Sequence, residues 1–569
     1  MALFCFFDQI LGYLAKISLL CLRLITQLMH RHIIAALAFI SAINAAQAGG
    51  NGLTFDASKG VAGSVTLPRG EVVNYTAYTG LYYVANVEDS TYQYMNIYVP
   101  EGATQQSPIF MPNDVGGYMA ARPRSVDGNG ASGRALSEGF VVAIAGARGR
   151  DSTVGSTYTG RAPKGLLDLK AAIRYLRHFD SEIPGDAEHI ITDGTSAGGA
   201  MSSLLGSTGN NPTYEPLLKA MGAADERDDI FAAVCFCPII DLDHADMAYE
   251  WLYGCTNDGV RRLNDAQKTV SEELAAAYPE YLNSLNLSKS DGTSLTADNY
   301  LDYLKEILIA SAQEAKDAGA DIPDSIGFTF GSSHGLQAPL NGGVGGPSDA
   351  GPQGDRQGPP DAGGGPGNGG PGGDRQGPPD SGGPGNGGPG NGGPRGGGPR
   401  GMMGMVGGMG SGETITSLDL PTYLAYVVST TPLKTPPAFD SQGVAGGRAS
   451  GENEEFGDET GSSVNFTDYS LRKATGDASA TVDAAIAENV RLLNPMRMME
   501  DEGSTIAPHW YIRHGARDRD TSFPVPVNLA TKLQNKGKDV NFKLPWNRPH
   551  SGDYALNELF AWMHAILAE

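Results

Sequence analysis

Ser196 stands at the centre of the stretch GTSAG, residues 194–198, which matches the pattern G-x-S-x-G. In a nucleophile elbow this pattern turns sharply from a strand into a helix, and its glycines leave room for the neighbouring elements. An apolar stretch precedes the motif here, and a helix-like stretch follows it. The pattern therefore predicts that Ser196 is a nucleophile. An ordinary structural turn is the alternative interpretation of so short a motif.

A nucleophilic serine needs a general base, which in this class of enzymes follows the serine in the chain. His550 lies in the stretch PWNRPHSGDY, after a predicted strand and before the last predicted helix. That position fits a catalytic histidine, and we predict His550 as the base. His514 is the alternative, although it lies on an apparent strand at residues 508–515.

The base in turn needs an acid that orients it. The stretch RHGARDRD offers Asp518 and Asp520 in a loop after a strand. We predict Asp518 as the acid and keep Asp520 as the alternative. Asp553 is too near His550 in the chain to be the usual partner, and we expect it to cap the last helix instead.

The oxyanion of an acyl-transfer intermediate needs two backbone donors. The N–H group of Ala197, directly after the nucleophile, is the predicted first donor. The second should come from a glycine turn after an early strand, and the stretch NDVGGY places Gly117 or Gly116 there. An ordinary turn is again the alternative interpretation.

The elements around these residues indicate an α/β fold. Apolar stretches predict buried strands, and spacings of three and four residues predict helices between them. The predicted strands lie at residues 92–100, 107–112, 139–150, 230–239, 508–515 and 540–546, and the predicted helices at 163–179, 265–318, 524–536 and 554–568. This alternation predicts a mostly parallel sheet.

The chain divides into a core that a long insertion interrupts. We expect the first part of the core at residues 49–240, an inserted lid at 241–495 and the second part of the core at 496–569. Within the lid, residues 341–412 consist mostly of Gly and Pro and repeat the octapeptide GDRQGPPD. That composition cannot bury a core and predicts a disordered segment.

The N-terminus is typical of a secretory signal. An apolar run at residues 33–48 follows a basic start and ends in an A-x-A site, which predicts cleavage after Ala48. Met29 fits a start codon for this signal, so residues 1–28 are interpreted as an upstream mis-start; an uncleaved membrane anchor is the alternative. The mature protein is expected to be secreted or periplasmic, without stable membrane association.

Composition excludes some functions. A net charge of −23 argues against nucleic-acid binding.

The three cysteines that follow the signal, Cys235, Cys237 and Cys255, allow either one disulfide from Cys255 or free buried thiols. The stretch DLDHAD at residues 241–246 lacks the spacing of a calcium loop, and we interpret it as structural. We predict no metal and no cofactor, and the sequence leaves the oligomeric state open.

Four longer segments carry a resemblance to a known family. They are GTSAGGAMSSLLGSTGN at residues 194–210, CPIIDLDHADMAYEW at 237–251, RHGARDRDTS at 513–522 and LPWNRPHSGDY at 544–554. In this order they resemble the bacterial tannases, tannin acyl hydrolases of the α/β-hydrolase superfamily. The resemblance extends from residue 92 to 563 without the glycine tract. Fungal tannases resemble enzymes in which two cysteines, one beside the catalytic Ser and one beside the His, bring these residues together. Thr195 and Ser551 take the places of those cysteines here, so the chain resembles the bacterial type.

The resemblance implies an α/β-hydrolase core with a lid that cleaves galloyl ester or depside bonds. The family's catalytic Ser, Asp and His would fall on Ser196, Asp518 and His550. Its galloyl-binding Lys, Glu and Asp would fall on Lys434, Glu452 and Asp520. Because the stretch from the lysine to the glutamate is longer here, Glu454 and Glu455 compete with Glu452. Gly116 is expected to line the same site.

Three other functions fit parts of this pattern. A feruloyl or other carboxylic ester hydrolase would keep the triad without the Lys, Glu and Asp set. A secreted peptidase would also keep the triad. A binding or surface protein, with an inactive hydrolase fold that displays the glycine-rich loop, would need neither the triad nor the Lys, Glu and Asp set. An intact set of Ser196, Asp518 and His550 argues against the last of these.

Overall fold

The computed structural model describes residues 52–256, 261–332 and 413–569. Its centre is a sheet in the order β1-β2-β3-β5-β4-β8-β9-β12-β13. The strands of this sheet are β1 (Val61–Thr66), β2 (Val72–Tyr82), β3 (Tyr94–Pro100), β4 (Pro108–Pro112), β5 (Val141–Ala145), β8 (Asp186–Thr195), β9 (Ala232–Phe236), β12 (His509–Arg513) and β13 (Asp539–Lys543).

The sheet is antiparallel at one side and parallel over the rest. Strands β1, β2, β3 and β5 pair antiparallel, and every pair from β5 onward to β13 is parallel. Strands β5, β9 and β12 are buried along their whole length, because helices cover both faces of a parallel sheet. The carboxyl ends of the parallel strands therefore meet at one edge, where such folds bind ligands.

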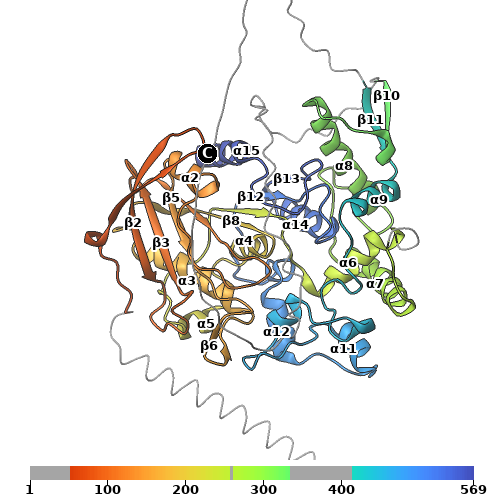
Figure 1. The fold of residues 1–569 in the computed structure, drawn as a ribbon, viewed down its shortest axis with the longest axis horizontal. Helices are drawn as coiled ribbons and strands as arrows, with labels where there is room; N and C mark the ends of the chain where they lie inside the picture. The colour runs from red at the N-terminus through yellow and green to blue at the C-terminus, as the bar shows by residue number, and fades with distance from the viewer. Residues whose placement is uncertain (1–51, 257–260, 333–412) are drawn as a thin grey trace, which may run out of the picture.

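Two layers of helices cover the sheet (Figure 1). Helices α2 (Ala131–Ser137) and α15 (Leu556–Leu567) bury their apolar residues against one face of the sheet. Three further helices, α3 (Lys164–His178), α4 (Ala197–Ser207) and α14 (Pro524–Asn535), bury their apolar residues against the other face of the sheet. Helix α15 has Ala555 as its N-cap and no side-chain capping bond, so the expectation that Asp553 caps it is wrong.

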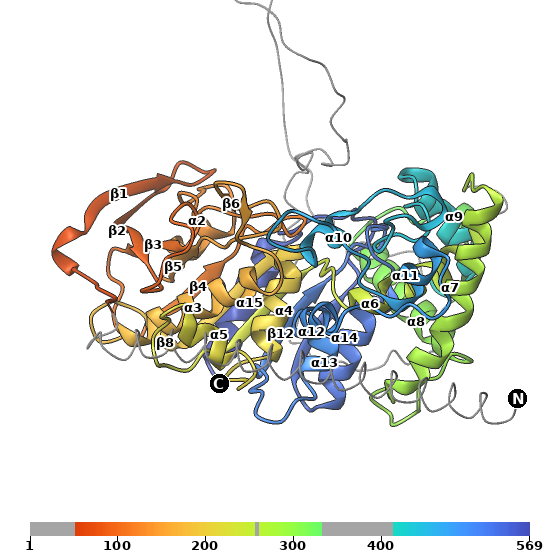
Figure 2. The same cartoon turned by 90° about the horizontal axis from the view of Figure 1, so that it is seen from below.

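A long insertion separates β9 from β12. Figure 2 shows its helices α7, α8 and α9 at the end of the molecule opposite β1. The insertion contains α6 (Leu242–Tyr253), α7 (Asp265–Ser284), α8 (Tyr300–Asp317), β10 (Phe328–Ser332), β11 (Glu413–Leu418), α9 (Leu420–Thr430), α10 (Gly451–Glu455), α11 (Asp468–Thr475), α12 (Ala484–Leu492) and α13 (Pro495–Met498). The small elements β6 (Thr153–Val154), β7 (Thr157–Tyr158) and α5 (Glu215–Ala220) lie before it.

This arrangement is an α/β-hydrolase core with an inserted lid, as predicted. The expected signal at residues 1–48 and the glycine-rich tract at 341–412 lie outside the described residues. Among the residues that the structure describes, helices are too short or too polar to cross a membrane. Cys235, Cys237 and Cys255 are free thiols, the first two buried and the third exposed, so the disulfide alternative is wrong.

Candidate active site

Ser196 lies in a sharp turn between β8 and α4. Its φ of 63° is unusual for a residue with a side chain and is the strained geometry of a nucleophile elbow. A Cβ atom on Gly194 would lie 2.2 Å from the Gly198 carbonyl oxygen, and one on Gly198 would lie 2.8 Å from Oδ1 of Asn113. Both distances are shorter than a Cβ atom can approach, so a larger residue at either position would displace the neighbouring atoms. The packing of the turn therefore explains its two glycines.

The elbow is fixed to the neighbouring strand β9. The N–H group of Ser196 donates to the carbonyl oxygen of Phe236 at 2.9 Å, and the N–H group of Ile239 donates to the carbonyl of Ser196 at 3.2 Å. The half-buried serine is thus held at the carboxyl edge of the sheet.

His550 and Asp518 meet at the same edge, on the loops that follow β13 and β12. Nδ1 of His550 lies 2.8 Å from Oδ2 of Asp518. The other carboxylate oxygen of Asp518 accepts the N–H group of Asp520 at 2.8 Å. Asp520 itself lies farther from the imidazole, at 3.7 Å from Nδ1. The shorter contact and the buried position of Asp518 favour it over Asp520 as the partner of His550.

The electrostatics of this pair suit a general base. Burial opposes the charged form of His550, but the Asp518 carboxylate outweighs it and raises the pKa of His550 above its ordinary value. Burial likewise opposes ionisation of Asp518, yet the two nearby histidines lower its pKa. Because the carboxylate stays charged and favours the imidazolium, His550 gains the basicity needed to take a hydroxyl proton.

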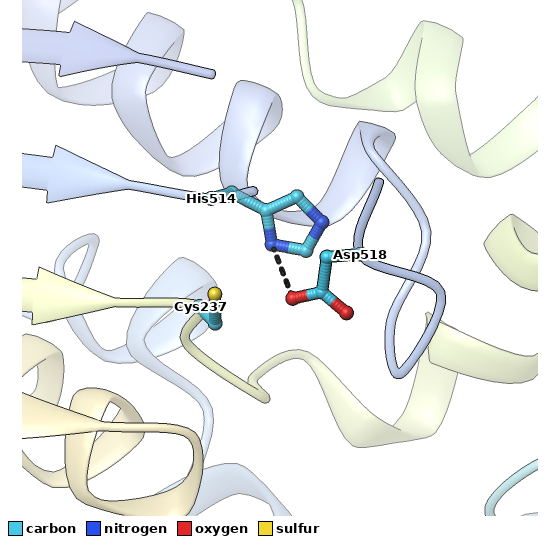
Figure 3. A group of neighbouring side chains, drawn as sticks. All are labelled: Cys237, His514 and Asp518. Carbon is cyan, nitrogen blue, oxygen red and sulfur yellow. Dashed lines mark ion pairs between the residues drawn. The ribbon is translucent and has the colours of Figure 1, made fainter. Parts of the chain in front are cut away.

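The alternative base, His514, is a buried neighbour of Asp518. Figure 3 shows His514 facing Asp518, with Cys237 beside them. Nδ1 of His514 is 3.4 Å from Asp518, and its ring is fully buried. A substrate could not reach a ring in this position, so the geometry favours His550 as the base.

Three groups of side chains among the described residues have the composition of a metal site, and one of them, Asp518, Asp520 and His550, consists of the candidate base and the two candidate acids. Ligand atoms of Cys237, His514 and Asp518 lie within 4.8 Å of one another, and so do those of Asp241, Asp243 and His244. In the group that contains Cys237, Asp518 already accepts from His550 and from a main-chain N–H. We interpret it as a side-chain cluster around the acid.

In the group of Asp241, Asp243 and His244, the two carboxylates accept hydrogen bonds from other side chains of the protein. Asn494 Nδ2 donates to Asp241 at 2.7 Å and to Asp243 at 2.8 Å. Tyr281 donates its hydroxyl to Asp241 at 2.5 Å, and Arg497 forms an ion pair with Asp243. These bonds are those expected of the structural role predicted for the stretch DLDHAD.

The loop that carries His550 packs directly on the elbow. A Cβ atom on Gly552 would lie 2.0 Å from Oγ1 of Thr195, so the two residues are in close contact. Thr195 precedes the serine, and Gly552 follows the histidine by two residues. This contact brings the segment of His550 next to the segment of Ser196.

The predicted oxyanion donors also lie beside the elbow. Ala197 is the first residue of α4. Gly116 and Gly117 lie in the loop after β4, with open space where their side chains would be. Asn113 joins this loop to the elbow, because its Nδ2 atom lies 3.1 Å from the carbonyl oxygen of Gly198.

Arg150 holds the other side of the Gly116–Gly117 loop. Its Nε atom donates to the carbonyl oxygen of Gly117 at 2.8 Å, and its main-chain N–H donates to that of Tyr118 at 2.8 Å. Its guanidinium also forms an ion pair with Glu454 of helix α10. Arg150 thus connects the lid to the predicted oxyanion loop.

Helix α6 connects Lys434 to the acid loop. The Tyr249 hydroxyl accepts the N–H group of Lys434 at 3.2 Å and donates to the Arg519 carbonyl at 2.9 Å. One turn further, the Tyr253 hydroxyl donates to the carbonyl of Asp518 at 3.1 Å. These two tyrosines are four residues apart and face the same way along the helix. They therefore fix Lys434 beside the loop of Asp518 and Asp520.

The three competing glutamates have different surroundings in helix α10. Glu454 pairs with Arg150. Glu455 is buried, and burial raises its pKa well above the ordinary value. Glu452 is only partly buried. Of the three, Glu452 is neither fully buried like Glu455 nor paired with Arg150 like Glu454, so it remains the candidate for substrate binding.

Sequence reasoning missed the residues that hold these groups in place, namely Asn113, Arg150, Tyr249 and Tyr253. None of them belongs to a catalytic pattern. For the two tyrosines a signal was present, because both lie in or directly after the segment at residues 237–251, and both face the acid loop from one helix.

Comparisons with known proteins show relatives among ester hydrolases. A family model described as BD-FAE matches residues 95–281. Esterase LipC of Mycobacterium tuberculosis is 33% identical over 172 residues, which are 30% of this chain and 37% of LipC. The probable carboxylic ester hydrolase LipM of the same organism is 37% identical over 80 residues, 14% of this chain and 17% of LipM. The chain therefore spans well under half of these curated relatives.

Solved structures match over nearly the whole chain. A tannin acyl hydrolase from Lactobacillus plantarum is 33% identical, with 91% of this chain and 99% of that chain covered and a TM-score of 0.69. The tannase of Fusobacterium nucleatum is 33% identical, with 91% and 100% covered and a TM-score of 0.70. A tannin acyl hydrolase in complex with ethyl gallate is also 33% identical, with 91% and 99% covered and a TM-score of 0.70.

Proposed function

The chain belongs to the bacterial tannase family and is a carboxylic ester hydrolase, and we propose that it cleaves galloyl ester and depside bonds to release gallic acid. The contact of 2.8 Å between His550 and Asp518, beside the elbow of Ser196, carries the proposal. A relative of this fold has been solved with ethyl gallate, which supports the same substrate class for this chain.

The proposed reaction proceeds through an acyl-enzyme. His550 takes the Ser196 proton as Oγ attacks the ester carbonyl, and the N–H groups of Ala197 and of Gly117 or Gly116 bind the oxyanion. Collapse of this intermediate expels the alcohol, which His550 protonates. Water then attacks the galloyl-serine ester, again with His550 as the base, and gallic acid leaves. Throughout, Asp518 orients the imidazole and stabilises its charged form.

We propose that Lys434, Glu452 and Asp520 bind the three hydroxyl groups of the galloyl ring. Asp520 lies 3.7 Å from the imidazole of His550, so a ring bound there stands close to the base. Tyr249 supports this assignment, since its hydroxyl links the backbone of Lys434 to the residue before Asp520. Such a site disfavours rings without hydroxyls, because a bound ring would cover these partly buried polar groups without offering them hydrogen bonds.

The remaining parts of the chain receive roles consistent with this activity. We propose that residues 1–48 are a signal that directs export, so that the enzyme acts in the periplasm or outside the cell on small galloyl esters. Residues 241–495 form the proposed lid, between core parts at 49–240 and 496–569.

The proposal is tested by hydrolysis of methyl gallate and methyl ferulate with the purified protein of residues 49–569. We expect release of gallate and much slower turnover of the ferulate. The Ser196→Ala variant is the control and should lose both activities. Turnover of the ferulate without the gallate would reject the substrate and leave a different ester hydrolase. Turnover of neither ester would favour a binding protein with this fold.

A further inference from the structure

The hydroxyl of Tyr554 lies between the two residues that flank His550. It donates to the carbonyl oxygen of Pro549 at 2.7 Å and accepts the N–H group of Ser551 at 3.2 Å. The segment around His550 is a loop without helix or strand. A single hydroxyl thus holds the peptide on both sides of the histidine, in a segment with no ladder of backbone bonds to do so.

The thiol of Cys237 completes the hydrogen bonding of this hydroxyl. Its Sγ atom lies 2.8 Å from the Tyr554 oxygen and 3.4 Å from the carbonyl oxygen of Ser551. Because the hydroxyl proton of Tyr554 is used by Pro549, the single thiol proton of Cys237 is shared between the phenolic oxygen and the carbonyl oxygen of Ser551. A hydroxyl offers one donor and two acceptor sites, and Pro549, Ser551 and Cys237 occupy all three.

Cys237 ties this bonded group to the rest of the site. It directly follows Phe236, whose carbonyl accepts the N–H of Ser196 at 2.9 Å, and its own N–H donates to Arg513 at 2.7 Å. Arg513 ends strand β12, which leads to the loop of Asp518. The ring of Tyr554 packs on that of Phe236, with centroids 5.8 Å apart. Cys237 therefore contacts the supports of the nucleophile, the acid and the base.

We propose that Tyr554 and Cys237 are positioning residues that fix His550 between Asp518 and Ser196. Their hydrogen bonds form a non-covalent link between the end of strand β9, which holds the elbow, and the histidine loop. The inference rests on the proposed function, since it takes His550 as the base. The backbone at residues 549–551 has no other support of this kind on both sides of the imidazole among the described contacts. A loose base would lower the rate of the chemical step without weakening substrate binding.

The test compares Tyr554→Phe with Tyr175→Phe in methyl gallate hydrolysis. Tyr175 of helix α3 also donates its hydroxyl to a main-chain carbonyl, that of Thr54 at 2.6 Å, which does not belong to the histidine loop. We expect Tyr554→Phe to lower kcat about 10- to 100-fold and to change KM less than about threefold. Tyr175→Phe should keep kcat, although it too loses a hydroxyl bond to a main-chain carbonyl, whereas Tyr554→Phe loses the bonds to Pro549, Ser551 and Cys237.

Cys237 gives a second pair of variants. Cys237→Ala removes the donor, whereas Cys237→Ser keeps one, so we expect the serine variant to retain more of kcat than the alanine variant. Equal kcat in the two would overturn the role of the thiol. The thermal unfolding of each variant is measured beside the kinetics, so that a loss of folded protein is separated from a loss of rate.

The wild type and the His550→Ala variant together separate this inference from the proposed function. If the wild type releases no gallate, the proposed function itself is wrong; if the wild type is active and His550→Ala stays active, His550 is not the base and the positioning role falls with it. If His550→Ala is inactive while Tyr554→Phe keeps kcat within about twofold of the wild type, only the positioning role is rejected. A rise in KM at unchanged kcat in Tyr554→Phe would reject it as well, because it would assign the hydroxyl to substrate binding.

Discussion

Nδ1 of His550 lies 2.8 Å from Oδ2 of Asp518, although the two residues are 32 positions apart in the chain. The loops after β12 and β13 meet because these strands are parallel neighbours, so both loops leave the sheet at the same edge. The same edge holds Ser196, since β8 and β9 are parallel members of the same sheet. The parallel order of the strands is therefore what assembles the candidate site.

The two aspartates of the acid loop should have separable roles. Asp518→Asn removes the carboxylate that orients His550, and we expect kcat to fall about 10³- to 10⁴-fold on every ester. Asp520→Asn should reduce hydrolysis of methyl gallate at least about tenfold but that of 4-nitrophenyl acetate less than about threefold, because acetate has no phenolic hydroxyls. Equal losses on both esters in Asp520→Asn would contradict its assignment to the galloyl ring.

Lys434 should determine selectivity rather than rate. Lys434→Met removes the ammonium group and keeps a long side chain over the ring of Phe439, where Nζ now lies 4.2 Å from the centroid. We expect the preference for methyl gallate over methyl benzoate to fall about 10- to 100-fold. Lys473→Met is the matched control, because that lysine pairs with Glu273 on the surface of α7. A preserved preference in Lys434→Met would remove this residue from the galloyl site.

The sequence was sufficient for the parts of the site that rest on local geometry. The elbow at Ser196 is a turn in which Gly194 packs on Gly198 within the motif itself, so a short pattern predicts it, although Gly198 also packs on the distant Asn113. The strands were predictable because β5 and β9 are continuous apolar runs. The choice between Asp518 and Asp520 was less secure, since both lie in one loop and only the backbone path decides which carboxylate faces His550.

The residues that position the site could not be predicted in the same way. The Cys237 thiol and the Tyr554 hydroxyl are 317 positions apart, and Arg150 and Glu454 are 304 apart. Contacts at such separations depend on how distant parts of the chain pack, the two parts of the core in the first case and the lid and the core in the second, which no local pattern encodes. The expected cap at Asp553 was wrong for a related reason, because the loop before α15 follows the histidine and the helix begins only at Leu556.

Arg150 should support the rate on all substrates. Arg150→Lys keeps the charge but loses the Nε donor to the carbonyl of Gly117, which lies 2.8 Å away. If Gly117 or Gly116 binds the oxyanion, we expect kcat to fall about tenfold on both methyl gallate and 4-nitrophenyl acetate. Glu454→Gln should have a smaller effect, since it weakens the ion pair and leaves the bond to Gly117. The exposed Arg227 provides the control variant Arg227→Lys. An effect of Arg150→Lys on methyl gallate alone would instead place Arg150 in substrate recognition.

Asp246 should make the stability of the protein depend on pH. This residue of α6 accepts the N–H groups of Phe439 and Asp440 at 2.8 and 2.9 Å and so holds the loop that follows Lys434. Burial nevertheless raises the pKa of Asp246 from 3.8 to about 7. Between these two values the folded chain keeps a proton that the unfolded chain has released. The stabilising contribution is therefore full below about pH 4 and is lost as the pH rises toward 7.

The measurement is the free energy of unfolding in urea from pH 5 to pH 8, for the wild type and for Asp246→Asn. One such group changes that free energy by at most about 1.4 kcal/mol per pH unit. Because asparagine does not titrate, the variant should show a smaller decrease with pH, even though it accepts one N–H bond fewer and is less stable at pH 5. Asp265→Asn, at the exposed start of α7, should keep the slope of the wild type. An unchanged slope in Asp246→Asn would show that this carboxyl is already ionised at pH 5, and that the loop beside Lys434 is held by a charged group.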